Sequence, residues 1–94
     1  MIVDLKKRAT HRSKIISGQL TGLQKMIDSE AYCMDILTQS LAIQKSLASL
    51  SKLILENHLM THITDMYSSG EAKQQIAATQ ELLDLYEITQ IRGK

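Results

Sequence analysis

Apolar residues recur at helical spacing along most of the chain, and the longest such run lies in its middle. A seam with intervals of three, four and seven residues, as in a coiled coil, is formed by Ile36, Ile43, Leu47, Leu50 and Ile54. A second set beside it widens the apolar face: Leu37, Leu41, Ala48, Leu55 and Leu59. Because no proline or glycine interrupts this stretch, the pattern predicts one long helix over about residues 30–66.

A shorter helix is predicted on each side of the long one. The first runs over about residues 4–27, and Asp28-Ser29 ends it and offers a side-chain oxygen to cap the next helix. Tyr67-Ser68-Ser69-Gly70 is a turn signal, and Ser68 with Glu71 has the spacing of a capping box for a helix over about residues 71–90. The chain is therefore predicted to be a single all-α domain, residues 1–94, with three helices.

The length of the middle helix predicts an oligomer. At 1.5 Å per residue it would be about 55 Å long, which exceeds the width of a compact domain of this size. The two shorter helices cannot cover the whole apolar face, so its remainder is expected to pack against another subunit. The favoured arrangement is an antiparallel four-helix bundle formed by two chains.

Composition narrows the class of protein further. The chain has no proline, phenylalanine or tryptophan, and its single cysteine excludes an intrachain disulfide. The polar start MIVDLKKRAT is unlike a signal peptide, and no apolar run approaches the roughly 20 residues that span a bilayer. We therefore expect a cytoplasmic protein with no membrane partner. Glycine-rich phosphate loops, G-x-S-x-G and H-E-x-x-H are missing, so an enzyme is not predicted.

Charge is distributed unevenly along the chain. Residues 1–25 contain one acidic residue, Asp4, and six basic ones: Lys6, Lys7, Arg8, Arg12, Lys14 and Lys25. The remainder of the chain contains more acidic than basic residues. A basic first helix indicates contact with phosphate groups, and a solvated helix face explains the pattern equally well.

One cysteine and two histidines suggest a metal site shared between chains. His58 and His62 are four residues apart and so lie on one face of a helix. Cys33 precedes His58 by about 37 Å of helix, too far for both to bind one ion in the same chain. If two copies of the long helix cross antiparallel near residues 46–47, Cys33 of one subunit lies beside His58 and His62 of its partner. A thiolate with two imidazoles suits Cu(I), Zn(II), Co(II) or Ni(II). Two ordinary surface histidines and a structural cysteine remain the alternative.

Three sequence blocks resemble one family of repressors. Arg12–Met26, RSKIISGQLTGLQKM, is similar to the R-x-x-x-I-x-G-Q-x-x-G-L-x-x-M opening of the CsoR/RcnR/FrmR repressors, which sense copper, nickel, cobalt or formaldehyde. Tyr32–Gln39, YCMDILTQ, and His58-Leu59 followed by His62 resemble their next two blocks, and Glu81–Asp84 resembles a segment of their third helix. The resemblance implies an antiparallel dimer that assembles into a tetramer, binds operator DNA when metal-free and releases it with inducer.

The resemblance also implies roles for individual residues. It makes Cys33, His58 and His62 the metal ligands, and Tyr32 and Glu81 the residues that link a bound imidazole to the third helix. The residues expected to contact the DNA backbone, all in the basic first helix, are Arg12, Lys14, Gln19, Lys7 and Arg8. Binding through backbone contacts would be strongly salt-dependent.

Departures from the family pattern bear on the inducer. His62 stands where copper sensors usually have cysteine, and Met1-Ile2-Val3 lacks the histidine that the nickel and cobalt sensors add. Cu(I) is therefore narrowly favoured over Ni(II) and Co(II), with Zn(II) possible. Ile15 and Thr21 replace cations common in relatives, which predicts fewer phosphate contacts. Two alternatives stay open: a formaldehyde-responsive repressor that acts through Cys33, and a helical assembly protein with no DNA role.

Overall fold

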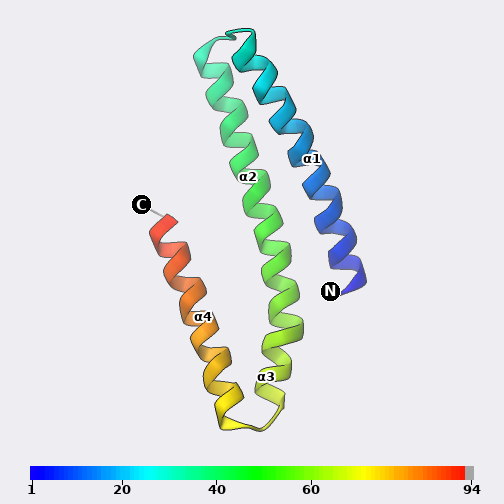
Figure 1. Ribbon diagram of the computed structural model, residues 1–94, viewed down its shortest axis with the longest axis vertical. Coiled ribbons are helices and arrows are strands. Elements are labelled where there is room, and N and C mark those ends of the chain that lie inside the picture. Colours follow the sequence, from blue (N-terminus) through cyan, green and yellow to red (C-terminus); the bar gives the residue numbers. More distant parts are fainter. Residues whose placement is uncertain (93–94) are drawn as a thin grey trace. The chain divides into compact units, whose positions relative to one another are not determined.

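A computed structural model describes residues 1–92, and every secondary-structure element in that range is helical (Figure 1). The elements in chain order are α1 (Val3–Asp28), α2 (Cys33–His58), a π-helical turn η1 (Leu59–Ile63), α3 (Thr64–Ser68) and α4 (Ala72–Arg92). The all-α prediction is confirmed. The chain divides into two compact units, Met1–Asn57 and the segment that begins at His58, and each is described separately below.

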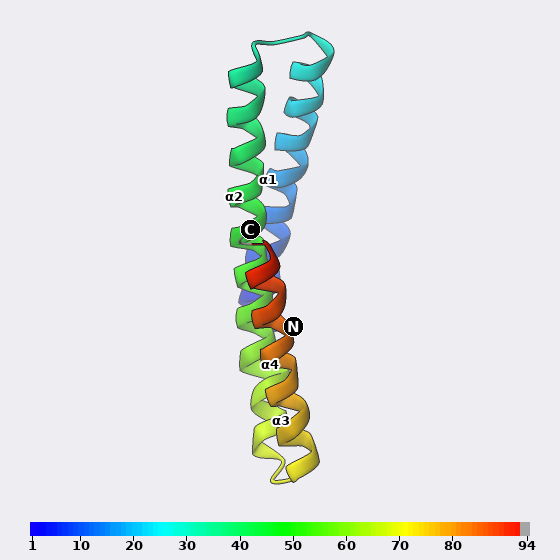
Figure 2. The same ribbon diagram turned by 90° about the vertical axis from the view of Figure 1, so that its left-hand side faces the viewer.

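In the first unit, α1 and α2 lie side by side and antiparallel (Figures 1 and 2). Apart from Gly22, the buried and half-buried residues of the α1 segment follow one another at intervals of three and four: Ile2, Leu5, Ala9, Arg12, Ile16, Gln19, Leu23 and Met26. The facing stripe of α2 has the same spacing: Ile36, Gln39, Ile43, Ser46, Leu50, Leu53 and Asn57. This 3-4 spacing is that of a coiled coil, and Leu5, Ala9 and Leu53 form its buried cluster.

Two hydrogen bonds, each between a polar side chain of α2 and the backbone of the α1 segment, fix the register of the hairpin. The N–H of Ile2 donates to Oδ1 of Asn57 at 2.9 Å, and Asn57 is only 7% exposed. Nε2 of Gln39 donates to the backbone carbonyl of Gln19 at 3.1 Å. Because both bonds belong to one antiparallel register, a shift of either helix by one turn would break both and leave buried polar groups unpaired.

The connection between α1 and α2 corrects two predictions. The second helix begins at Cys33 and not near residue 30, because Glu30 has a φ of 55° that interrupts helical backbone. Ser29 does not cap α2, since its hydroxyl donates to the carbonyl of Met26 at 3.3 Å and so closes α1. The carbonyl of Tyr32 instead accepts the N–H groups of Asp35 and Ile36, at 2.9 and 3.2 Å.

The apolar seam predicted for the middle helix splits between two faces. Ile43 is buried and Ile36 and Leu50 are half-buried on the face towards α1. Leu47 and Ile54 are 42% and 46% exposed. They join other exposed apolar residues of this helix: Leu37, Leu41 and Leu55. One chain thus leaves a long apolar surface on α2 uncovered, which fits the predicted dimer. The oligomeric state stays a prediction.

The second unit starts with a π-helical turn in place of the uninterrupted helix that the sequence predicts. The hydroxyl of Thr64 donates to the carbonyl of Leu59, five residues earlier, at 2.8 Å. Helical backbone then continues through α3 to Ser68, two residues beyond the predicted end. Inserted π turns are rare and frequently occur at functional sites.

The turn from α3 into α4 is shorter than predicted, because Tyr67 and Ser68 are helical, and its capping residue differs. Gly70 has a φ of 76°, and the oxygen that accepts the N–H of Glu71, at 3.2 Å, belongs to Ser69 and not to Ser68. Tyr67 ties the two helices of this unit together, because its hydroxyl lies 2.7 Å from Oγ1 of Thr79. Among the described residues, no helix is long and apolar enough to cross a membrane.

Candidate metal centre

The two histidines predicted as ligands are in direct contact. His58 is the last residue of α2, and His62 lies one turn later, within the π-helical turn. Their Nδ1 atoms are 3.3 Å apart, and their ring centroids are separated by 5.2 Å. Both rings therefore turn the same nitrogen towards a common point.

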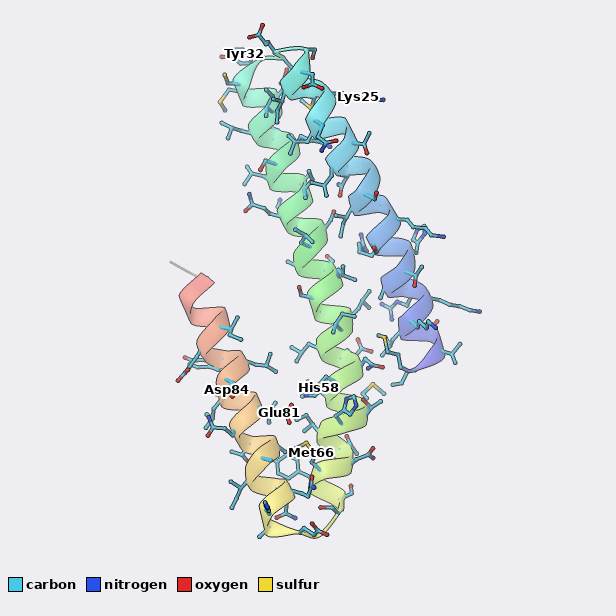
Figure 3. All side chains as sticks on the ribbon, viewed as in Figure 1. Lys25, Tyr32, His58, Met66, Glu81 and Asp84 are labelled. Atoms are coloured by element: carbon cyan, nitrogen blue, oxygen red, sulfur yellow. The ribbon has the colours of Figure 1, made fainter. Side chains whose placement is uncertain are left out.

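The carboxylate of Glu81, on α4, fixes the orientation of His58. Nε2 of His58 lies 2.9 Å from Oε1 of Glu81, and the two side chains are 29% and 44% exposed. Figure 3 shows the pair at the same level of neighbouring helices. A carboxylate only accepts hydrogen bonds, so Nε2 of His58 donates, and a neutral ring then carries its lone pair on Nδ1. That nitrogen is the one that faces His62.

The spacing of the two Nδ1 atoms fits a shared metal ion. Two nitrogen ligands about 2.0 Å from one ion, at a tetrahedral angle, are about 3.3 Å apart. The observed distance is also 3.3 Å. A histidine ligand usually donates its second ring N–H to a carboxylate or carbonyl, and Glu81 occupies that position for His58. The donor set is incomplete in itself, because two imidazoles leave further coordination positions open.

Cys33 is separated from the histidines within the chain. It is the first residue of α2 and His58 is the last, so about 37 Å of helix lies between them. Among the described residues of one chain, no group of three histidine, cysteine, aspartate or glutamate side chains could hold a metal ion. The Cys33 thiol is free and exposed, which leaves it available to a ligand or another chain.

Tyr32 precedes Cys33 and its side chain is 72% exposed. Figure 3 shows it at the connection between α1 and α2. Its backbone carbonyl starts α2, as described above, but its predicted role beside a bound imidazole stays a prediction.

The residues predicted to contact DNA do not all share one surface of α1. Lys7, Arg8 and Lys14 are exposed, whereas Arg12 is half-buried on the stripe that faces α2. Gln19 lies on the same stripe, and its Oε1 is buried with no hydrogen-bond partner. The sequence motif does not distinguish these positions. The 3-4 spacing that Arg12 and Gln19 share with Leu5 is the signal that could have placed these two residues on the side of α1 that faces α2.

A family of metal-sensitive transcriptional repressors matches residues 5–88 of the chain. The copper-sensing transcriptional repressor CsoR of Bacillus subtilis (strain 168) is 37% identical over 81 residues, which cover 86% of this chain and 77% of that protein. CsoR of Mycobacterium tuberculosis (strain ATCC 25618 / H37Rv) is 36% identical over 84 residues, covering 89% of this chain and 68% of that protein.

A solved structure shows the same fold. The crystal structure of the copper-sensing repressor CsoR with Cu(I) from Geobacillus thermodenitrificans NG80-2 superposes with a TM-score of 0.74 at 28% identity, over 93% of this chain and 90% of that one. These relatives are repressors, which act by binding, and this confirms the prediction that the chain is not an enzyme. The chain belongs to the family of metal-sensitive transcriptional repressors, as its three sequence blocks predicted.

Proposed function

We propose that this protein is a copper-responsive repressor that binds operator DNA when metal-free and releases it on binding Cu(I). The observation that carries the proposal is the arrangement of His58, His62 and Glu81, in which two imidazole nitrogens face each other at ligand spacing. The copper-sensing relatives and the similarity to a structure with Cu(I) support copper over nickel, cobalt or zinc.

The complete site forms between two chains of an antiparallel dimer. Cys33 of one subunit provides a thiolate, and His58 and His62 of its partner provide two Nδ1 atoms. A thiolate with imidazoles is a suitable donor set for Cu(I). The exposed apolar residues of α2 supply the surface that such a dimer would bury, and two dimers then form a tetramer. The protein acts in the cytoplasm, where thiols remain reduced.

In this proposal, residues on α1 bind the DNA, and the site around His58 binds the inducer. Arg12 and the exposed cations of α1 contact phosphate groups, so the affinity falls steeply with salt. A bound Cu(I) would join the two chains, held by Cys33 of one subunit and by His58 and His62 of its partner. Glu81 then carries the changed position of His58 to α4, and the tetramer favours a shape that holds DNA less well. By linkage, operator DNA weakens copper binding by the same free energy.

A metal titration tests this proposal. Reduced, metal-free protein is titrated anaerobically with Cu(I) against a competing chelator, and then with Ni(II), Co(II) and Zn(II). We expect one tight Cu(I) per subunit, absent from Cys33→Ala and retained in His11→Ala, which removes a histidine outside the site. Operator binding is measured in parallel by fluorescence anisotropy, and Cu(I) should release the duplex from the wild type but not from Cys33→Ala.

Two results would contradict the proposal. If Cys33→Ala still released DNA at the same Cu(I) concentration as the wild type, the ligand assignment would be wrong. If no metal bound tightly while formaldehyde added a covalent bridge at Cys33, detected by mass spectrometry, the inducer would be the aldehyde.

A further inference from the structure

A network of hydrogen bonds joins α3 to the first half of α4 in the second unit. The hydroxyl of Tyr67, near the end of α3, lies 2.7 Å from Oγ1 of Thr79 on α4. The hydroxyl of Thr79 donates its one hydrogen to the backbone carbonyl of Gln75 at 3.0 Å, so Tyr67 is the donor to Thr79. Nε2 of Gln75 donates in turn to the backbone carbonyl of Tyr67 at 3.2 Å. The three bonds form a closed network that begins and ends at Tyr67.

Apolar packing within this unit is limited. Among residues 58–88, whose burial the structure describes, only Ile63 and Ala78 are buried. The turn that joins α3 to α4 contains Gly70, which has no side chain to restrict its backbone. The polar contacts between the two helices therefore have a large share in setting the position of α4.

The carboxylate that contacts His58 follows this network along the chain. Glu81 lies two residues after Thr79, about 3 Å further along the axis of α4. Oε1 of Glu81 is 2.9 Å from Nε2 of His58, and Figure 3 shows Met66, the neighbour of Tyr67, below this pair. Hydrogen bonds between nitrogen and oxygen lie within about 2.7–3.2 Å, so a small shift of α4 would break the contact.

We propose that Tyr67 is a positioning residue for the metal centre. Its hydroxyl, through Thr79, holds α4 at the height at which Glu81 orients the imidazole of His58. The proposal rests on the proposed function, because it adds a residue to the same site. Since Tyr67 acts on the ring of His58 through Glu81, removing its hydroxyl has no further effect on the metal once Glu81 is absent.

This dependence distinguishes a positioning residue from one that only stabilises the fold. A stabilising residue would cost the same whether or not Glu81 is present, and the effects of the two substitutions would add. Residues that act through one contact give effects that do not add. The combination of Tyr67→Phe with Glu81→Ala therefore tests the proposal directly.

The first measurement is the Cu(I) affinity of the full chain, by chelator competition on reduced protein. Tyr67→Phe keeps the aromatic ring and should lower the affinity about three- to tenfold, the range that one ordinary hydrogen bond represents. In a chain that already carries Glu81→Ala, the same substitution should change the affinity by less than about twofold. Tyr86→Phe is the matched control, since it removes the hydroxyl of an exposed tyrosine of α4 outside the network, and it should also stay within about twofold.

Thr79 supplies a second pair of variants. Thr79→Val removes the oxygen that accepts the hydrogen bond from Tyr67, so it should lower Cu(I) affinity as much as Tyr67→Phe does. Thr79→Ser retains a hydroxyl at the same place and should stay within about twofold of the wild type. Circular dichroism establishes that all variants remain helical.

Nuclear magnetic resonance of the metal-free protein gives a readout that does not depend on copper. Long-range proton–nitrogen correlation spectra, recorded at one mildly alkaline pH, identify the tautomer of His58. The contact with Glu81 holds the ring hydrogen on Nε2 in the wild type. In Tyr67→Phe and Thr79→Val, the His58 signals should move towards those of Glu81→Ala.

The two readouts separate this proposal from the proposed function. If Tyr67→Phe gives the same His58 signals as Tyr86→Phe, or lowers Cu(I) affinity equally with and without Glu81, Tyr67 does not position the site. If the wild type binds no Cu(I) but the His58 signals change as expected, the positioning of His58 stands and the copper function fails. If Cu(I) binds and releases operator DNA while Tyr67→Phe and Thr79→Val behave like the wild type, the function stands and the positioning role fails.

Discussion

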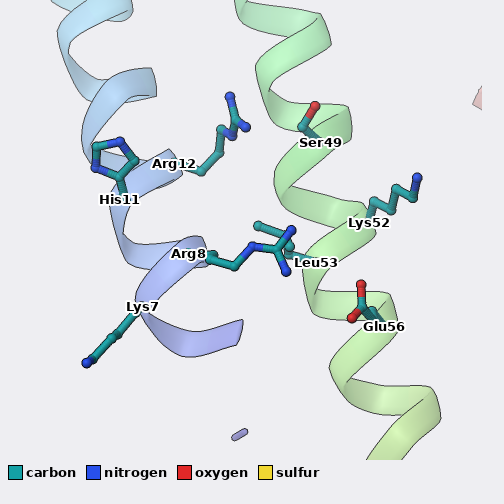
Figure 4. A pocket seen from close by; sticks show the side chains of 8 residues that line it. All are labelled: Lys7, Arg8, His11, Arg12, Ser49, Lys52, Leu53 and Glu56. Carbon is teal, nitrogen blue, oxygen red and sulfur yellow. The ribbon is translucent and has the colours of Figure 1, made fainter. Parts of the chain in front are cut away.

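The candidate metal centre and the cleft between α1 and α2, into which Arg8 and Arg12 point (Figure 4), differ in how firmly their side chains are held. His58, His62 and Glu81 already contact one another at 2.9 and 3.3 Å. The arginines of the cleft point towards α2, and the ion pair that Arg8 makes is long and exposed. A metal ion requires ligands at fixed distances, whereas a phosphate is bound mainly by the number and reach of nearby charges. The contrast predicts that substitutions at one site will leave the other largely unaffected.

The largest effect is expected at the ligands themselves. His58→Ala should lower Cu(I) affinity more than about 100-fold, because it removes a metal ligand and, with it, the contact to Glu81. The loss should exceed the one caused by removing only a residue that orients a ligand. Affinity for operator DNA without metal should stay within about twofold of the wild type. Chelator competition and anisotropy measure the two quantities. Equal losses of Cu(I) affinity and of DNA affinity would mean that His58 supports the fold of the whole protein.

Glu81→Ala should give the next largest effect. Removing the partner of a ligating histidine usually costs 10–100-fold in metal affinity, because the ring loses its orientation and tautomer. Asp84→Asn is the matched control: this carboxylate, one turn further along α4, pairs with Gln80 at 2.9 Å. Chelator competition on both variants checks the prediction. Similar affinities for the two would show that the contact between His58 and Glu81 does not survive metal binding.

Arg12→Gln tests the other side of the comparison. Loss of one phosphate contact should weaken operator binding about fivefold near 0.15 M salt, and the plot of log affinity against log salt should become less steep. Cu(I) affinity, measured without DNA, should not change. A loss of copper binding in this variant would break the separation between the two sites.

The smallest effect is expected at the π-helical turn. Thr64→Val keeps the shape of the side chain but removes the donor to the carbonyl of Leu59, which lies 2.8 Å away. Because the bond is exposed, the free energy of unfolding should fall by only about 0.5 kcal/mol. Urea denaturation measures the change. A loss well above that value would show that the turn contributes strongly to the stability of the fold.

The helices could be predicted from the sequence because their apolar spacing is regular, but their ends depend on single residues. Glu30 adopts a left-handed conformation that its residue type does not announce, so the start of α2 was misplaced. Ser69 and Ser68 are adjacent and chemically equal, and only the backbone decides which hydroxyl receives the N–H of Glu71. Apolar periodicity likewise showed two stripes on the long helix without showing that Leu47 and Ile54 lie away from α1.

The candidate site was predicted unevenly for a similar reason. The spacing of His58 and His62 indicated a shared face, and the family resemblance suggested Glu81, whose contact with His58 the structure provides. The facing Nδ1 atoms depend on ring orientations that spacing does not determine. The direction of Arg8 and Arg12 towards α2 was missed because it depends on the register of the hairpin (Figure 4). That register is set by Asn57 and Gln39.

The polar residues within the hairpin stripe also give α2 two surfaces of different selectivity. Its inner stripe pairs with any helix only if a free N–H and a carbonyl stand opposite Asn57 and Gln39, which α1 of the same chain provides. An approaching α2 from another chain offers leucine and isoleucine side chains and would leave both groups buried without partners. The chain therefore distinguishes its own helix from a neighbour's by chemistry, and the exposed apolar side of α2 is the surface that the proposed dimer would bury.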